Sequence, residues 1–143
     1  MSNQEINRLA DLREKFRKAV QQKENTMSLE ERDELKTLCQ KEKKGEIARF
    51  GKDYDWLLEL LHRHDLAEIK DVPLDEYDGE ARIMLRWLFS VEEPSHRQIT
   101  DKLAETFAVM FSPRGQDSDT VWRENTKNPK FIKAGREIFN HFK

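Results

Sequence analysis

The sequence has one cysteine, only five glycines and four prolines, and no apolar run that approaches 18 residues. A single cysteine excludes an intrachain disulfide framework and is compatible with a reducing compartment. So few glycines and prolines argue against a turn-rich β-sandwich or barrel and favour helices. Without a long apolar run, and without the basic region and apolar core of a secretory signal at Met1–Glu5, we expect a cytoplasmic protein that contacts no membrane.

Charged residues are abundant although the net charge is small. They make up 38% of the chain, against 36% hydrophobic residues, yet the net charge is only −2. Disordered chains combine low hydrophobicity with high net charge and few aromatic residues, whereas this chain has 8 Phe, 3 Trp and 2 Tyr. Its 143 residues suit one domain, or one domain with an appendage. The sequence therefore predicts a folded chain with a modest core.

The charge is divided unevenly along the chain. Residues 1–50 carry 12 basic and 10 acidic side chains, residues 51–95 carry 5 and 12, and residues 96–143 carry 9 and 6. The isoelectric point of about 6.1 argues against general affinity for nucleic acids. The basic C-terminal third nevertheless leaves a local nucleic-acid contact open, and the acidic middle suits a basic partner.

Two capping boxes, Ser2-x-x-Glu5 and Ser28-x-x-Glu31, precede apolar residues that recur every three or four positions. This pattern predicts two amphipathic helices, and the short break between them predicts an antiparallel hairpin over residues 3–50. Asp53 is a plausible N-cap for a third helix that ends near His64.

The C-terminal part has the order of a helix-turn-helix. A helix opens at Pro94-Ser95 and is followed by a turn near 112–116, a short polar helix near 118–125, and a last helix that opens at Asn128-Pro129. A short β-wing within 112–130 remains an alternative for part of this stretch. The fold class is therefore all-α with five to six helices, namely an N-terminal hairpin and a C-terminal helix-turn-helix-like bundle, with or without a wing.

The longest irregular stretch, residues 66–78, is acidic and contains Pro73. We expect it to be a loop between residues 1–65, which hold the hairpin and third helix, and the C-terminal bundle at 79–143. The two parts are also compatible with one continuous domain.

In a helix-turn-helix the second helix presents polar side chains to the major groove, while basic residues around it meet phosphates. The candidate nucleic-acid-binding residues are Arg114, Thr120, Arg123, Lys127, Lys130 and Lys133. Trp122, within the same segment, is better interpreted as a core residue than as a contact.

Catalytic motifs are missing from the sequence. It has no Gly-rich phosphate loop, no Gly-x-Ser-x-Gly and no His-Glu-x-x-His. Cys39 lies on an apolar helix face and is interpreted as a small buried residue. His62 and His64 are two residues apart, so on a helix they point to different faces and do not chelate one ion. We expect a protein that is not an enzyme, with no cofactor and no metal site.

Residues 80–142 resemble the C-terminal helical domain of RteC-type regulators of conjugative transposons. The shared residues are an apolar helix at Ala81–Phe89, the pattern Ile99-x-x-x-Leu103-Ala104-x-x-Phe107-x-x-x-Phe111, Arg123 in a polar linker, and a last helix with Lys130-Phe131-Ile132 and Ile138-Phe139. The resemblance implies a winged-helix-like DNA-binding domain that acts in a mobile element. The first 79 residues show no such likeness.

Two function classes follow. The first is a non-enzymatic DNA-binding or regulatory accessory protein, of a phage or mobile element, whose partner is double-stranded DNA. The alternative is a helical protein–protein interaction module, an adaptor, complex subunit or inhibitor, that uses the hairpin (also as a homodimer) or an acidic face. That face would be built from Asp71, Asp75, Glu76, Asp78, Glu92 and Glu93.

Overall fold

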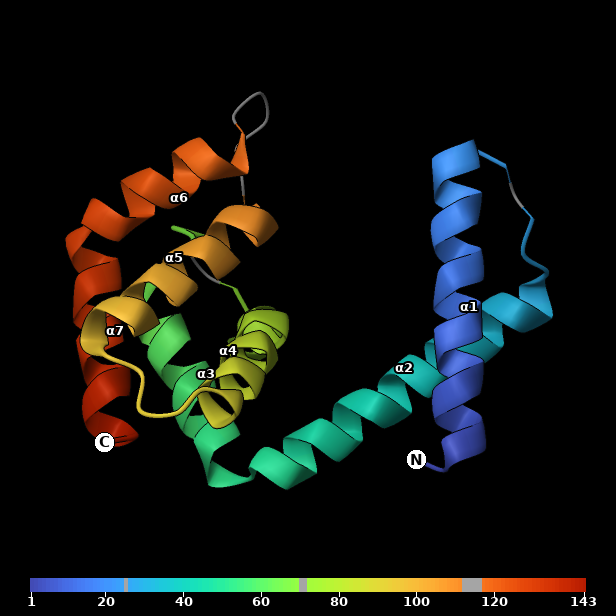
Figure 1. Cartoon of the computed structure of the whole chain (residues 1–143), viewed down its shortest axis with the longest axis horizontal. Coiled ribbons are helices and arrows are strands. Elements are labelled where there is room, and N and C mark those ends of the chain that lie inside the picture. The colour runs from blue at the N-terminus through green and yellow to red at the C-terminus, as the bar shows by residue number, and fades with distance from the viewer. Residues whose placement is uncertain (25, 70–71, 112–116) are drawn as a thin grey trace. The chain divides into compact units, whose positions relative to one another are not determined.

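The computed structural model describes residues 1–24, 26–69, 72–111 and 117–143, and every regular element within these ranges is a helix (Figure 1). The elements are α1 (Asn3–Gln22), α2 (Leu29–Phe50), α3 (Lys52–His64), the 3-10 helix η1 (Leu74–Tyr77), α4 (Asp78–Ser90), α5 (His96–Phe111), α6 (Ser118–Lys127) and α7 (Pro129–His141). The predicted all-α class is confirmed. The predicted count of five to six is too low, because the described ranges contain seven α-helices.

The predicted β-wing is wrong for residues 117–130. Asp117 caps α6, which continues to Lys127, and Asn128 caps α7 directly after it. Two consecutive N-caps leave no extended segment that is long enough for a strand. The other part of that prediction, residues 112–116, lies outside the described residues.

The chain forms two compact units, Met1–Arg49 and Phe50–Lys143. The first unit contains α1 and α2 up to Arg49, and the second contains α3 to α7. The segment 66–78, expected to be an acidic loop between two parts, lies inside the second unit, where residues 74–77 form η1 and Asp78 begins α4.

Side-chain caps begin both helices of the first unit. Ser2 Oγ accepts a hydrogen bond from the Glu5 backbone N–H at 3.2 Å, and Glu5 Oε1 accepts one from the Ser2 N–H at 3.1 Å. Ser28 and Glu31 form the same reciprocal pair at 3.1 and 3.0 Å. These bonds satisfy backbone donors that the first helical turn leaves open, as the two capping boxes predict.

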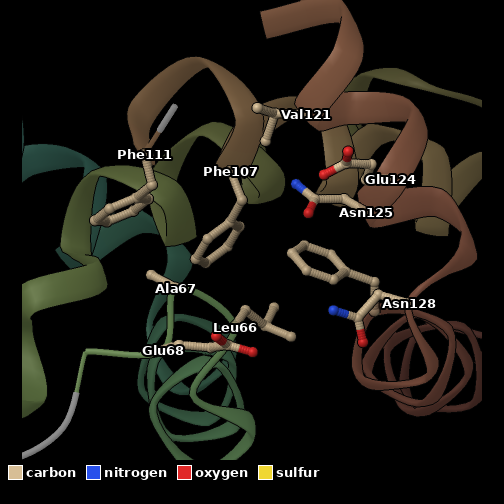
Figure 2. Close-up of a pocket in the computed structure, with 10 residues that line it drawn as sticks. Leu66, Ala67, Glu68, Phe107, Phe111, Val121, Glu124, Asn125 and Asn128 are labelled. Atoms are coloured by element: carbon tan, nitrogen blue, oxygen red, sulfur yellow. The ribbon is translucent and has the colours of Figure 1, made fainter. Parts of the chain in front are cut away.

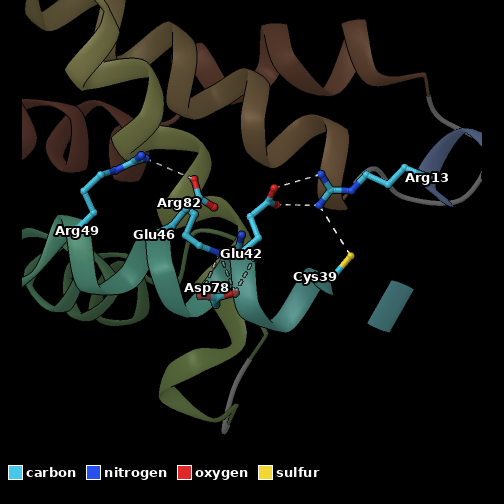
Figure 3. Close-up of polar contacts among 7 residues, drawn as sticks. All are labelled: Arg13, Cys39, Glu42, Glu46, Arg49, Asp78 and Arg82. Carbon is cyan, nitrogen blue, oxygen red and sulfur yellow. Dashed lines mark hydrogen bonds and ion pairs between the residues drawn. The ribbon is translucent and has the colours of Figure 1, made fainter. Parts of the chain in front are cut away.

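The apolar cluster of the first unit is small. Its buried members are Leu9 and Leu12 of α1, Met27 of the connection, and Leu38 of α2. Cys39 packs against this cluster and is partly buried, and its Sγ accepts a hydrogen bond from Arg13 Nη2 at 3.8 Å (Figure 3). So few buried residues leave much of the contact between α1 and α2 to polar groups.

Ion pairs complete the contact between α1 and α2. They are Arg8–Glu34 at 2.8 Å, Arg13–Glu42 at 2.7 Å, Lys15–Glu31 at 2.5 Å and Lys41–Glu5 at 2.6 Å. Figure 3 shows the guanidinium of Arg13 facing both carboxylate oxygens of Glu42. These pairs are at the surface, where each contributes little and salt screens it. The contact therefore depends on several weak polar interactions acting together.

The polar contact makes the first unit sensitive to acid. The ammonium of Lys41 and the Ser2 N–H lower the pKa of Glu5 to about 2, and Lys15 and the Ser28 N–H lower that of Glu31 to about 2. A carboxyl group whose pKa is lower in the folded state stabilises the fold fully above its ordinary pKa of 4.5. That stabilisation is lost as the pH falls from 4.5 toward 2.

We expect helicity measured by far-UV circular dichroism to fall over this pH range before tryptophan fluorescence changes. All three tryptophans, Trp56, Trp87 and Trp122, lie in the second unit, so their fluorescence reports on that unit. The variant Glu5→Gln/Glu31→Gln should flatten this acid transition. The matched control is Glu30→Gln, at an exposed position. Equal pH profiles for the native chain and the double variant would contradict the assignment.

The second unit has a larger core around α5. Leu57, Leu60 and Leu61 of α3, Met84 and Leu85 of α4, Ile99, Leu103 and Phe107 of α5, and Phe131 and Ile138 of α7 are all buried. Phe107 meets Phe131 edge to face, with ring centroids 5.7 Å apart. This geometry is favourable for aromatic rings and adds to the burial of apolar surface.

A buried polar group joins α3 to the start of α4. The Tyr54 hydroxyl donates a hydrogen bond to Asp78 Oδ1 at 2.6 Å, and Arg82 Nη2 donates to Asp78 Oδ2 at 3.1 Å, the pair shown in Figure 3. Burial and the bond to Asp78 raise the pKa of Tyr54 above its usual value. Asp78, expected to be an exposed acidic residue, is therefore a structural residue with only 8% of its surface exposed.

Helices α5 and α7 approach each other closely at Thr100 and Gly135. A Cβ atom built on Gly135 would lie 2.2 Å from Thr100 Oγ1 and 3.2 Å from Thr100 Cα. No side chain fits at that separation, so this contact requires glycine. The close approach allows Phe131, Ala134 and Ile138 of α7 to bury against the unit.

We expect Gly135→Ala to lower the free energy of unfolding by about 1–3 kcal/mol, the usual cost of overpacking a core. Urea unfolding followed by tryptophan fluorescence measures it. Combining the change with Thr100→Ala removes the closest atom and should restore part of the loss. Gly45→Ala is the control, because it lies in α2 of the first unit, where its Cβ meets nothing within 4 Å, and should leave the fluorescence transition of the second unit unchanged. A Gly135→Ala variant as stable as the native chain would contradict the close approach.

Candidate nucleic-acid interface

Two side-chain caps set the ends of α6. Asp117 Oδ1 accepts a hydrogen bond from the Thr120 N–H at 2.8 Å, and this bond lowers the pKa of Asp117. At the other end, Asn128 Oδ1 accepts from the Lys130 N–H at 3.0 Å and begins α7, with Pro129 as its first residue. Helix α6 is therefore a defined segment between two capping residues, Asp117 and Asn128, that the sequence marks as caps.

The inner face of α6 is attached to the backbone of α5. Trp122 Nε1 donates a hydrogen bond to the Asp101 carbonyl at 3.1 Å, and Asn125 Nδ2 donates to the Ala104 carbonyl at 3.2 Å. Val121, directly before Trp122 in the sequence, is buried. The indole of Trp122 therefore helps to hold α6 on α5, although Trp122 is only partly buried and not the core residue that the sequence predicts.

The outer face of α6 carries three of the predicted site residues. Thr120, Arg123 and Lys127 are exposed, and their spacing of three and four residues places them on one side of the helix. That side is opposite the one that bears Val121 and Asn125. Within the described ranges, neither Arg123 nor Lys127 forms an ion pair. These three side chains are thus gathered on one surface and available for an external contact.

The other three predicted site residues, Arg114, Lys130 and Lys133, do not lie on the outer face of α6. Lys130 Nζ lies 3.7 Å from a carboxylate oxygen of Glu68, so it has an acidic partner. Lys133 is exposed on α7. Arg114 lies outside the described residues. Asp119 and Glu124 also lie on α6 and balance the charges of Arg123 and Lys127, so α6 as a whole carries no net charge.

A pocket of about 250 Å³ that was not expected from the sequence lies beside α6 (Figure 2). Its apolar part includes Leu66, Phe107 and Phe131, and its polar part includes Glu68, Glu124 and Asn125. These residues come from four segments far apart in the sequence: the turn after α3, then α5, α6 and α7. No local pattern joins them, so sequence reasoning had no signal for this pocket.

The histidines considered as metal ligands have other partners. His62 Nε2 lies 3.1 Å from the Val72 carbonyl oxygen, and His64 Nε2 forms a short contact with Glu137. The bond from His64 lowers the pKa of Glu137, with a smaller contribution from Arg63. Among the described residues, no group of three or more His, Cys, Asp or Glu side chains is arranged to hold a metal ion.

None of the described helices is long and apolar enough to cross a membrane. Comparison with known proteins finds no family model, no curated protein and no solved structure that matches this chain, so its function has to be argued from its own residues.

Proposed function

We propose that this protein is a non-enzymatic DNA-binding or regulatory accessory protein, and that α6 is the helix that enters the major groove. The observation that carries the proposal is the two-sided character of α6. Its inner face is fixed to α5 by Trp122 and Asn125, while Thr120 and Arg123 stand exposed on the outer face together with Lys127.

The dimensions and chemistry of α6 suit this role. An α-helix with its side chains is about 10–12 Å across, and the major groove is about 12 Å wide, so a helix such as α6 fits within it. An arginine guanidinium binds the O6 and N7 acceptors of guanine through two donors, and a threonine methyl packs against the thymine methyl. Anchors on the inner face fix the helix before binding, which reduces the entropy lost on contact.

The resemblance to RteC-type regulators supports the same class and extends it to a regulator in a mobile element. Under this proposal α5 is the supporting helix and α6 the reading helix of a helix-turn-helix. Residues 118–127 and 129–130 are helical and are separated only by the cap Asn128, so the proposal uses α6 alone and needs no wing from them. Lys133 on α7 and Lys127 at the end of α6 supply phosphate contacts.

The number of phosphate contacts sets how strongly DNA binding should depend on salt concentration. If Arg123, Lys127 and Lys133 each neutralise one phosphate, the logarithm of the binding constant should fall with the logarithm of salt concentration with a slope of about −2.7. Between about 50 and 200 mM salt, affinity for DNA should then drop about 40-fold. The net charge of −2 offers no additional general attraction.

The predicted DNA binding is tested by fluorescence anisotropy at both salt concentrations. The probes are random duplex DNA and DNA from around the gene of this protein. Arg123→Ala/Lys127→Ala should weaken binding and reduce the salt slope by about 2. The control Lys36→Ala/Lys44→Ala removes the same charge from exposed positions of the first unit. Equal weakening by both pairs, or no binding to either DNA at the lower salt, would reject α6 as the reading helix.

A second candidate function, protein–protein interaction, is favoured by exposed apolar residues in the first unit. Phe16 and Val20 of α1 are 50% and 61% exposed, and they line a hollow of about 240 Å³ with Ala19 and Met27. Exposed apolar patches on a folded chain commonly mark interaction sites. The acidic face considered earlier is weaker, because Asp78 is buried and Asp71 lies outside the described residues.

If the first unit binds a second copy of the chain, size exclusion with light scattering should show a dimer whose fraction rises with protein concentration. Val20→Glu places a charge in the patch and should shift the equilibrium to monomer. Val109→Glu, at a 66% exposed position of α5, is the control and should leave it unchanged. A native chain that remains monomeric at every concentration would contradict self-association through this patch.

A further inference from the structure

Glu80, in the first turn of α4, is an acidic residue in an almost fully buried position. Only 2% of its surface is exposed. Oε2 of its carboxyl group forms no hydrogen bond within the part of the chain that the structure describes. Buried polar groups are nearly always hydrogen-bonded, and an ionised carboxylate without a partner is far more costly to bury than the neutral acid. The position of Glu80 therefore favours its protonated form.

The ionisable groups that act on Glu80 from η1 and the start of α4 are mostly acidic. Asp78, two residues before it, and Glu76 of η1 both repel a negative charge on Glu80. Tyr77 is fully buried, and its hydroxyl donates a hydrogen bond to Asp65 Oδ1 at 3.4 Å. Burial, and then the negative charges of Asp65 and Glu80, raise the pKa of this hydroxyl. An ionised Glu80 would thus add a further negative charge to an acidic neighbourhood.

The cation in this neighbourhood is Arg82, and its guanidinium binds Asp78. Arg82 Nη2 donates a hydrogen bond to Asp78 Oδ2 at 3.1 Å (Figure 3). The attraction of Arg82 for a charged Glu80 is weaker than the repulsion from either Asp78 or Glu76. The surrounding charges therefore do not compensate for the burial of a carboxylate at position 80.

The other two helices that pack against α4 bring no buried charge to it. A Cβ atom on Gly79 would lie 3.8 Å from Met110 Cε, and Thr106 Oγ1 lies 3.8 Å from Met84 Sδ. These contacts place the end of α5 along the first half of α4, and residues 106–111 contain no charged side chain. On α3 the buried residues are one tyrosine and four leucines, namely Tyr54, Leu57, Leu58, Leu60 and Leu61.

These surroundings set the sign of a pH effect. Burial raises the pKa of Glu80 and repulsion from Asp78 and Glu76 raises it further, while its own backbone N–H and Arg82 act in the opposite direction. A carboxyl group whose pKa is raised by folding destabilises the fold when it ionises. This cost is absent below the ordinary pKa of 4.5 and grows as the pH rises above it. Its sign is opposite to that of the acid sensitivity of the first unit.

We propose that Glu80 is a proton-dependent switch in the second unit, buried as the neutral acid, whose ionisation loosens the packing of η1 and the first turn of α4. A charged carboxylate regains its hydration only when these segments move away from α3 and α5, because the closed packing excludes water from it. The inference goes beyond the proposed function and is tested without DNA, so its failure and the failure of DNA binding are separate results.

The first test is urea unfolding between about pH 5 and about pH 8, followed by the fluorescence of the three tryptophans, which all lie in the second unit. The native chain is compared with Glu80→Gln, which cannot ionise. The ratio of their unfolding constants, native over variant, should rise about 10-fold over this range, the usual effect of leaving a buried acceptor unsatisfied. Histidine titration contributes equally to both chains and cancels in the ratio. The control Glu59→Gln removes an exposed carboxylate of α3 and should keep the native pH profile.

Hydrogen–deuterium exchange locates the loosening. After correction for the intrinsic exchange rate, residues 74–85 of the native chain should lose about 10-fold in protection between about pH 6 and about pH 8, and more than residues 129–141 lose. In Glu80→Gln the two segments should keep their protection. Equal losses in both segments of the native chain would reject a local switch.

Two further results would overturn the inference. One is a ratio of unfolding constants that stays the same across the pH range, because Glu80 would then not change its protonation there. The other comes from the native chain and applies even if Glu80→Gln does not fold. The ¹³C carboxyl resonance of Glu80 should stay at its protonated position as the pH passes the ordinary pKa of 4.5, while that of exposed Glu59 moves. A Glu80 resonance that moves together with that of Glu59 would reject the switch.

Discussion

Small residues on and against α5 allow α6 and α7 to come close to it, and the second unit depends on that closeness. Ala104 is fully buried on α5, and Gly135 of α7 meets Thr100 where no Cβ would fit. Close packing brings the carbonyls of Asp101 and Ala104 within reach of Trp122 and Asn125. The outer face of α6 and the pocket on its inner side are both consequences of this approach.

The two units are stabilised by different physical means. In the first, the buried apolar residues are few and exposed ion pairs connect α1 to α2. Such pairs respond to salt and acid, because both remove the attraction between the charges. In the second, aromatic and aliphatic side chains are packed densely around α5. Apolar burial is indifferent to ionic strength at ordinary salt concentrations, so a change in conditions can affect one unit before the other.

Local signals in the sequence identified several helix starts, although α3 is capped at Gly51 and the predicted cap, Asp53, lies within its first turn. The reciprocal bonds of Ser2 with Glu5 and the cap at Asn128 each involve residues two or three positions apart, so the pattern contains all the information. The inward position of Val121 also follows from helical spacing. Such features are predictable because one short segment determines them.

Features that join distant segments escaped prediction. Asp78 lies in an acidic run typical of a loop, but its partner Tyr54 is 24 positions away and buries it. Phe89 belongs to the most apolar segment of the chain, yet it is 58% exposed. Only one face of α4, the face with Ala81, Met84, Leu85 and Leu88, is buried. Lys130 was grouped with the phosphate-binding candidates, and its pairing with Glu68 depends on the turn after α3. In each case the outcome is decided by tertiary neighbours that a one-dimensional pattern does not contain.

The division of α6 into an attached face and an exposed face has a consequence for how this chain can change. Positions 121, 122 and 125 hold the helix in place, while Arg123 and Lys127 are exposed and form no ion pair within the described ranges. Under the proposed function, substitutions at Arg123 and Lys127 would alter what the surface recognises at little cost in stability, because both side chains are exposed. Under that proposal, α6 separates recognition from the maintenance of the fold, and it offers two exposed positions at which new specificities could be selected.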